Sequence, residues 1–174
     1  FKEITPFKAV TVVQEYKNVM VIDSRFPYEY NAGHFPDAIN VCTQEHFEKV
    51  FTLNRRLSEK EKPILLFYCE FSNIRCVRVA TTLRDMDYQY LMDSQEGTWN
   101  YPEIYIIAGG YKQIYQDLGY AKLDSESGMG SVRYVAMASG DKNEYDMCRL
   151  DFDRFFKQVQ IPGKRFHQRM SICQ

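Results

Sequence analysis

A cysteine and an arginine in the segment CEFSNIR, residues 69–75, have residue types and a spacing that could do chemistry. Cys69 ends an apolar run, five residues intervene, and Arg75 opens an amphipathic pattern. A loop that enters a helix presents unpaired backbone N–H groups, and the helix dipole adds a partial positive charge there. Such a loop binds a tetrahedral oxyanion, and Arg75 adds a planar guanidinium fork. Because the same field lowers the pKa of the Cys69 thiol, the segment predicts a thiolate nucleophile facing a bound phosphoryl group.

The surrounding elements decide whether this spacing is informative, since a buried cysteine followed by a helix-starting arginine also occurs by chance. Near-continuous apolar runs at 19–23, 64–68 and 104–108, with a weaker run at 38–42, predict strands buried on both faces. Helical spacing at 44–51, 75–86 and 111–118 alternates with them, and a last amphipathic helix follows at 147–159. We expect Gly119 to end the third of these helices. The alternation predicts an α/β fold with a central, mostly parallel sheet of about five strands flanked by helices.

Composition excludes several classes of function. The chain has 174 residues and a net charge of −1, which is ordinary for one globular domain and argues against nucleic-acid binding. It contains no apolar stretch long enough to span a membrane. Its five cysteines show no metal-ligand spacing, so we expect reduced thiols, no metal or cofactor, and a location in the cytoplasm, the nucleus or both. A monomer is the default expectation.

Several motifs, in order, resemble the M-phase inducer phosphatases, the dual-specificity phosphatases of the cell-division cycle. They are the entry segment FKEITPFKAV, then VIDSRFPYEYNAGHFPDAINV, YCEFSNIR, YPEIYIIAGGYKQIY and RYVAM. The resemblance covers residues 1–138 and implies a rhodanese-like, three-layer α/β domain with its phosphate-binding loop at the carboxyl end of the sheet. It thereby implies one catalytic domain over 1–174, with a C-terminal helix and tail at 139–174.

Matched position by position, the resemblance makes Cys69 the nucleophile that forms a phosphocysteine and Arg75 the clamp for the phosphate and the transition state. Glu70 is the candidate general acid, with a protonated substrate monoanion as the alternative proton source. Arg84 falls where the family docks its kinase substrate. The implied substrates are adjacent phosphothreonine and phosphotyrosine residues of a cyclin-dependent kinase, and the implied role is to promote mitosis. The implied phosphate-binding loop comprises Glu70, Phe71, Ser72, Asn73, Ile74 and Arg75.

The sequence departs from the family pattern at positions that bear on activity. Tyr68 stands where the family has a histidine, and Ile74 replaces an acidic residue. Ser24 occupies the place of a cysteine that forms a disulfide with the nucleophile, so we predict no regulatory disulfide at the family's site. Cys76 and Cys42 are the alternative partners, although a position just inside the helix is poor disulfide geometry for Cys76. These differences support an alternative function, a catalytically impaired rhodanese-like module that binds phosphate or a kinase. An arsenate reductase of the same fold is a lesser alternative.

Other charged and glycine-containing segments have structural interpretations. Asp23, Arg25, Glu29 and His34 predict a buried ionic scaffold beneath the loop. The acidic stretch 84–96 predicts an exposed loop, and Gly109 with the glycine after it predicts a tight turn from strand to helix.

Overall fold

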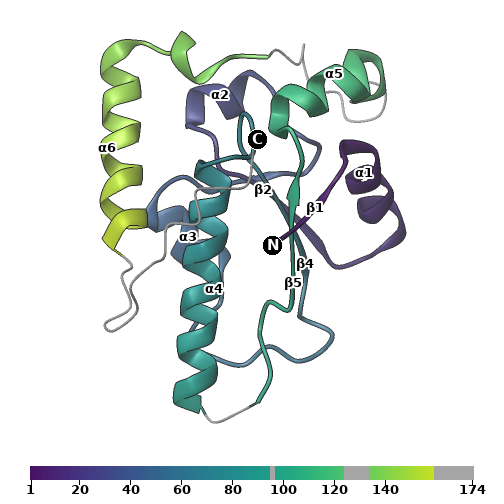
Figure 1. The fold of residues 1–174 in the computed structure, drawn as a ribbon, viewed down its shortest axis with the longest axis vertical. Coiled ribbons are helices and arrows are strands. Elements are labelled where there is room, and N and C mark those ends of the chain that lie inside the picture. Colours follow the sequence, from purple (N-terminus) through teal and green to yellow (C-terminus); the bar gives the residue numbers. More distant parts are fainter. Residues whose placement is uncertain (95–96, 124–133, 159–174) are drawn as a thin grey trace.

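Five short strands form one parallel sheet at the centre of residues 1–94, 97–123 and 134–158, the part of the chain that the computed structural model describes (Figure 1). The strands are β1 (Lys2–Ile4), β2 (Val19–Asp23), β3 (Ile39–Asn40), β4 (Ile64–Tyr68) and β5 (Glu103–Ile107). Their order is β1-β5-β4-β2-β3, and each neighbouring pair is parallel. The register pairs Asp23 with Tyr68, so the residues that follow β2 and β4 meet at the same edge. This confirms the α/β class and the central parallel sheet.

Helices cover both faces of the sheet. They are α1 (Pro6–Glu15), α2 (Pro27–Ala32), α3 (Gln44–Val50), α4 (Arg75–Ser94), α5 (Gly110–Leu123), α6 (Lys142–Gln158) and the 3₁₀ turn η1 (Met137–Ser139). Figure 1 shows α1 and α5 on one side of the sheet, and α3, α4 and α6 on the other. Side chains of β4 alternate between two hydrophobic cores, with Leu66 and Tyr68 facing α5, and Leu65 and Phe67 facing α4. The chain therefore has the three layers that the resemblance implies.

The helix after the CEFSNIR loop is longer than its apolar spacing indicated. It runs to Ser94, so most of the acidic stretch 84–96 is helical, and the prediction of an exposed loop there is wrong. Asp87 places a charged side chain on the buried side of α4, and hydrogen bonds compensate its burial. Its buried carboxylate accepts hydrogen bonds from the backbone N–H groups of Asn100 at 3.0 Å and Tyr101 at 2.9 Å.

Two other predicted helices differ in detail. Gly119 does not end α5, which continues to Leu123. In α6, Phe152 is buried, but Met147 and Leu150 are exposed, so the apolar side of that helix is narrower than predicted. Val159 and the tail that follows lie outside the described residues.

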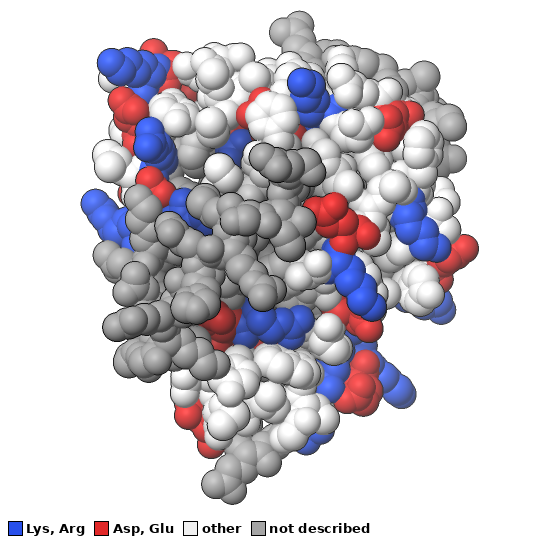
Figure 2. All heavy atoms as spheres, in the orientation of Figure 1, with Lys and Arg blue, Asp and Glu red and all other residues white. Residues whose placement is uncertain are grey.

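The surface shows no separation of charge on the face seen in Figure 2, where lysine and arginine are interspersed with aspartate and glutamate. This distribution agrees with the net charge of −1. Among the described residues, no helix is both long and apolar enough to cross a membrane.

Candidate active site

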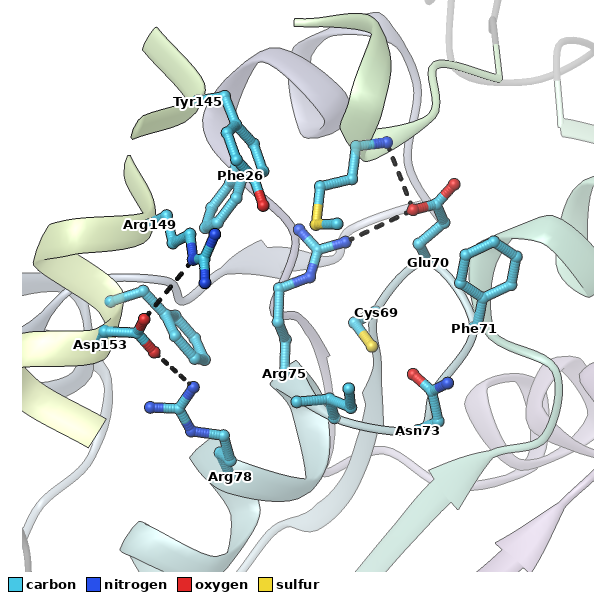
Figure 3. Close-up of a pocket in the computed structure, with 13 residues that line it drawn as sticks. Phe26, Cys69, Glu70, Phe71, Asn73, Arg75, Arg78, Tyr145, Arg149 and Asp153 are labelled. Carbon is cyan, nitrogen blue, oxygen red and sulfur yellow. Dashed lines mark hydrogen bonds and ion pairs between the residues drawn. The ribbon is translucent and has the colours of Figure 1, made fainter. Parts of the chain in front are cut away.

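The CEFSNIR loop lies between the carboxyl end of β4 and the first turn of α4, as predicted (Figure 3). Cys69 directly follows the last residue of β4, and Arg75 is the first residue of α4. Ser72, midway along the loop, has a left-handed backbone with φ of 56°. This reversal curls the loop around the Cys69 sulfur, to which the backbone N–H groups of Ile74 and Cys76 donate hydrogen bonds.

Two glycines bring α5 directly behind the loop. Gly109 and Gly110 have φ of +71° and +63°, a left-handed conformation that glycine adopts without strain. A Cβ on Gly110 would lie 2.4 Å from the carbonyl oxygen of Cys69. The close approach lets the N–H of Tyr111 donate to that same oxygen at 2.8 Å. The predicted tight turn is confirmed, and it packs against the backbone of the CEFSNIR loop.

The surroundings of the Cys69 thiol lower its pKa. Its side chain is only 2% exposed, yet its pKa is lowered to about 5. The largest cause is a hydrogen bond from the thiol of Cys76, followed by the positive charge of Arg75 and the two loop amides. Burial acts in the opposite direction but is outweighed. The lowered pKa favours the thiolate form of Cys69 at neutral pH.

Arg75 is held in place by a carboxylate from another element. Its Nη2 donates to Oε1 of Glu29 at 3.0 Å, and its Nη1 donates to Oε2 of the same side chain. Glu29 lies on α2 and also accepts the backbone N–H of Phe26 at 2.9 Å. Burial raises the pKa of Glu29 and the hydrogen bonds from Arg75 oppose that shift. Because both Nη atoms donate to Glu29, the orientation of the Arg75 guanidinium beside Cys69 is fixed (Figure 3).

Glu70 points away from the loop interior and toward the segment that precedes α6. Its carboxylate accepts hydrogen bonds from the Tyr134 hydroxyl at 2.6 Å and the Met137 backbone N–H at 3.3 Å. Arg75 Nη2 lies 3.8 Å from the same carboxylate. The Tyr28 hydroxyl donates to the Met137 carbonyl at 2.5 Å, so this segment is tied to both α2 and the loop. The Glu70 carboxylate is therefore held by donors from the segment before α6.

The loop opens into a pocket of about 490 Å³ that extends to α6. Figure 3 shows Cys69 and Arg75 on one side and Arg149 and Asp153 on the other. Arg78 of α4 closes this far side, because its Nη1 donates to Asp153 at 2.8 Å. At the rim, Phe71 and Ile74 are 47% and 52% exposed. The remaining lining residues are Phe26, Glu70, Asn73, Met137, Tyr145 and Phe152. The described residues contain no cluster of three or more side chains that could hold a metal.

A buried ionic scaffold lies beneath the loop, as predicted. Arg25 and Asp23 form a fully buried ion pair at 2.6 Å, and the Arg25 guanidinium lies 3.7 Å from the centroid of the Tyr111 ring. Tyr68 is buried in this scaffold and hydrogen-bonds Asp23, and burial raises its pKa well above the ordinary value. Tyr68 thus fills the position of the family histidine as a neutral group. His34 is not part of the scaffold, because its ring stacks on Tyr30 at a centroid distance of 3.9 Å.

Arg84, the predicted docking residue, lies on α4 away from the pocket. Its guanidinium lies 4.7 Å from the centroid of the Trp99 ring and 3.6 Å from the Asp87 carboxylate. Burial lowers the pKa of Arg84, and Asp87 opposes that shift. The side chain is therefore half-buried and ordered by its neighbours, which is compatible with a fixed contact point.

Sequence reasoning missed parts of this site. Glu29 was expected in the scaffold, but its pairing with Arg75 was not foreseen. Of the two substitute cysteines, Cys76 contacts the Cys69 sulfur, whereas Cys42 lies 3.6 Å from the side-chain oxygen of Asn40. The pocket wall from α6 was also missed, although Tyr145, Arg149 and Asp153 recur at the four-residue spacing of one helix face.

Comparison with known proteins agrees with this architecture. Residues 10–117 match the rhodanese-like domain, and the chain belongs to that family. An M-phase inducer phosphatase of Caenorhabditis elegans is 32% identical over 179 residues, which cover 99% of this chain and 55% of the relative. M-phase inducer phosphatase 1 of Bos taurus is 34% identical over 101 residues, which cover 57% of this chain and 18% of the relative. The resemblance to this group of phosphatases is thereby confirmed, and the chain spans only part of the length of each relative.

Among solved structures, the As/Sb reductase from Leishmania major is similar, with a TM-score of 0.48 and 22% identity. The match covers 67% of this chain and 78% of that chain.

Proposed function

We propose that this domain is a dual-specificity protein phosphatase that hydrolyses phosphothreonine and phosphotyrosine through a phosphocysteine. The observation that carries the proposal is the pairing of two groups in one pocket: a thiolate at Cys69, with a pKa of about 5, and an Arg75 fork fixed by Glu29. Relatives that align over most or all of this chain are named M-phase inducer phosphatases. This similarity supports a phosphorylated cyclin-dependent kinase as the substrate and a role in promoting cell division.

The proposed reaction has two steps at the phosphorus atom. In the first, the Cys69 sulfur donates an electron pair to phosphorus while the bond to the ester oxygen of the substrate breaks. In the second, water attacks the phosphocysteine and the sulfur leaves as a thiolate. Arg75 and the amides of the loop bind the equatorial phosphoryl oxygens in both steps. Arg75 lines the same pocket as Cys69 before the substrate binds, with both Nη atoms hydrogen-bonded to Glu29.

The ester oxygen must gain a proton as it leaves. The acid role predicted for Glu70 stays a prediction, and its contacts weigh against it, because the carboxylate is already engaged by the Tyr134 hydroxyl and the Met137 backbone N–H. We infer that the proton comes from the phosphate monoanion of the substrate. Glu70 then acts by holding the segment before α6 against the loop.

Hydrolysis of 4-nitrophenyl phosphate by the purified chain tests the proposal directly. We expect turnover that vanadate inhibits and that Cys69→Ser abolishes, and Cys42→Ser is the matched control because its buried thiol lies outside the pocket. A folded chain without turnover that still binds tungstate would contradict the proposal. That result would favour the alternative, a phosphate-binding module whose catalysis is impaired by Tyr68 and Ile74.

We further propose that Arg84 contacts the kinase substrate. The ordered guanidinium, stacked on Trp99, supports this role. The expected effect of Arg84→Ala is a KM for the phosphorylated kinase that rises about tenfold, measured by phosphate release. Arg154→Ala, which removes an exposed arginine from α6, is the control. An unchanged KM in the Arg84 variant would contradict the docking role.

We also propose that the protein acts in the cytoplasm, the nucleus or both, because these reducing compartments keep a catalytic thiol free.

A further inference from the structure

A basic tetrapeptide with an exposed serine lies between α3 and β4. Its sequence is Arg55-Arg56-Leu57-Ser58, and both arginines and the serine are exposed. Basophilic protein kinases recognise a serine that is preceded by arginine at two and three positions, because acidic pockets of the kinase bind the guanidinium groups. The four residues, all within the described part of the chain, lie outside the lining of the Cys69 pocket. The tetrapeptide therefore has a pattern that the proposed reaction does not use.

Ser58 begins a tight turn and is held there by Glu61. Its hydroxyl donates to Glu61 Oε2 at 2.8 Å, and its backbone N–H donates to the same oxygen at 2.9 Å. Arg55 Nη2 donates to the other carboxylate oxygen at 2.7 Å. The hydrogen bonds from Arg55 and Ser58 lower the pKa of Glu61 to about 2, so this carboxylate is ionised at neutral pH. One carboxylate thus joins the serine to the first arginine of the motif.

A phosphate on Ser58 would reverse the charge relations in this turn. Phosphoserine carries a charge of about −1.5 to −2 at pH 7, so it repels the Glu61 carboxylate that the serine now contacts. Arg55 lies on that same carboxylate, and a guanidinium pairs with phosphate through two parallel hydrogen bonds. Arg55 is thus placed to exchange Glu61 for the phosphate.

The turn must open before a kinase can bind it in an extended form. Leu57 is only 5% exposed, and its N–H donates to Asn100 Oδ1 at 2.8 Å. Asn100 Nδ2 donates in turn to the carbonyl of Arg55 at 2.9 Å. These contacts hold a short surface segment whose other side chains are exposed, so local opening costs much less free energy than global unfolding.

We propose that Ser58 is a phosphorylation site for a protein kinase that recognises paired arginines, and that its phosphate captures Arg55 from Glu61. In the transfer, Ser58 Oγ attacks the γ-phosphorus of ATP, and the bond to the bridging oxygen breaks to release ADP. The hydroxyl proton passes to the catalytic base of the kinase. ATP supplies the phosphoryl group, so the step needs no other co-reactant.

The motif is connected to Arg84, the proposed docking residue. Arg56 Nη2 donates to Thr98 Oγ1 at 3.1 Å, and the next residue, Trp99, has its ring centroid 4.7 Å from the Arg84 guanidinium. Asn100, which holds the motif through two hydrogen bonds, follows Trp99 directly. A turn displaced by the phosphate loosens the contacts on both sides of Trp99. Phosphorylation should therefore weaken docking of the kinase substrate, a consequence that rests on the proposed function.

Phosphorylation of the whole chain in vitro tests the site. The purified chain is incubated with ATP, vanadate and the catalytic subunit of cyclic-AMP-dependent protein kinase, and mass spectrometry of its peptides locates the phosphate. We expect phosphate at Ser58, none at that position in Ser58→Ala, and a rate about tenfold lower in Arg56→Ala, which loses a charged contact with the kinase. Ser139 is the internal control, because it is exposed but follows no arginine within three positions.

A synthetic peptide of residues 52–61 separates recognition of the motif from access to it. We expect the peptide to be phosphorylated faster than the folded chain, since it needs no opening of the turn. Phosphorylation of the peptide but not of the chain would overturn the proposal. The same conclusion would follow from equal rates in Arg56→Ala and the unmodified chain.

Urea denaturation tests the exchange of Arg55. In the unmodified chain, Glu61→Gln removes the carboxylate that Arg55 and Ser58 share, so it should lower the urea midpoint. In the phosphorylated chain the same substitution removes a repulsion, so it should raise the midpoint. Glu48→Gln, at an exposed position of α3, is the control, and its effect should not depend on phosphorylation. A Glu61→Gln shift of the same sign in both forms would overturn the exchange.

Kinetics test the effect on docking. The phosphorylated and unmodified chains are compared on 4-nitrophenyl phosphate and on the phosphorylated kinase. We expect equal kcat/KM for the small ester and a KM for the kinase that rises about fivefold, the loss of one neutral hydrogen bond. Equal KM values would overturn the effect on docking. A chain that takes up phosphate at Ser58 but hydrolyses neither substrate would contradict the proposed function and leave the phosphorylation site supported.

Discussion

Glu29 and Arg75 are joined by two hydrogen bonds across 46 positions of sequence, and this pair connects α2 to the first residue of α4. Both side chains are buried, and the Arg75 guanidinium also lies 4.8 Å from the centroid of the Phe26 ring. The Arg75 guanidinium is thereby oriented by a residue outside the loop. Its geometry depends on the position of α2 as much as on the loop itself.

Glu29→Gln should lower kcat/KM for 4-nitrophenyl phosphate by about 100-fold, the loss that accompanies a misplaced catalytic group. The glutamine retains one acceptor but no charge, so the buried Arg75 loses the nearer of its two carboxylate partners and its guanidinium is expected to turn. A broken buried pair also costs about 3–5 kcal/mol of unfolding free energy, which denaturation in urea measures. Glu48→Gln, an exposed glutamate of α3, is the control. Retained activity in Glu29→Gln would show that the loop alone orients Arg75.

The acidity of Cys69 predicts a particular pH dependence of stability. The folded pKa of about 5 lies below the ordinary value of 9.0, so between these values the unfolded thiol holds one more proton than the folded one. The free energy of unfolding contributed by this group is therefore fully present above pH 9 and is lost as the pH falls through 5. We expect urea denaturation to show the difference between the unmodified chain and Cys69→Ala growing from pH 5 to pH 9 in favour of the unmodified chain. A difference that does not vary over this range would contradict the lowered pKa.

Glu70→Gln distinguishes the two sources of the leaving-group proton. If the substrate monoanion supplies it, the variant should slow phenyl phosphate and 4-nitrophenyl phosphate by a similar factor, since Glu70 then only supports the segment containing Tyr134 and Met137. A general acid matters most for the poorer leaving group. Selective loss of phenyl phosphate hydrolysis would therefore assign the acid role to Glu70. Tyr134→Phe, which removes one donor to the carboxylate, is the matched variant for the supporting role.

The strand, the loop and the start of α4 could be predicted from sequence because their order is local. An apolar run, then Cys69, then Arg75 at the start of a helical pattern determines which backbone groups face the anion. The contacts that complete the site are not local. Glu70 and Met137 are 67 positions apart, and Arg78 and Asp153 are 75 apart, so they meet only through the packing of α6. A single sequence holds no measure of such distances.

The proximity of Cys76 to Cys69 was missed for a different reason. The residue is close in sequence, but its contact with Cys69 depends on how the loop curls, and that curl includes the left-handed backbone of Ser72. Ser72 is not a residue type that signals positive φ, unlike glycine. Asp87 contributed to the wrong prediction of an exposed loop at 84–96, because acidic side chains are usually exposed. Here its buried carboxylate accepts hydrogen bonds from two backbone N–H groups.

Gly110→Ala should displace the CEFSNIR loop or α5, which pack against each other at this glycine. The new Cβ would lie 2.4 Å from the Cys69 carbonyl oxygen and 2.6 Å from that of Glu70, which are backbone atoms that cannot rotate away. Either α5 or the loop must move, and the N–H of Tyr111 then loses its 2.8 Å hydrogen bond to the Cys69 carbonyl. We expect a loss of about 2–4 kcal/mol in unfolding free energy by urea denaturation, with slower turnover in the fraction that remains folded.

Gly97→Ala is the matched control for this prediction. Gly97 also has a positive φ, of +26°, but a Cβ there would meet nothing within 4 Å. The substitution adds backbone strain without a collision, so it should lower the unfolding free energy by about 1 kcal/mol. It should leave unchanged the pH midpoint at which iodoacetamide alkylates Cys69, followed by mass spectrometry. If the two variants lose the same stability, the positive φ and not the contact with the loop limits position 110. If Gly110→Ala alone shifts the pH midpoint of Cys69 alkylation, the turn before α5 contributes to the position of Cys69.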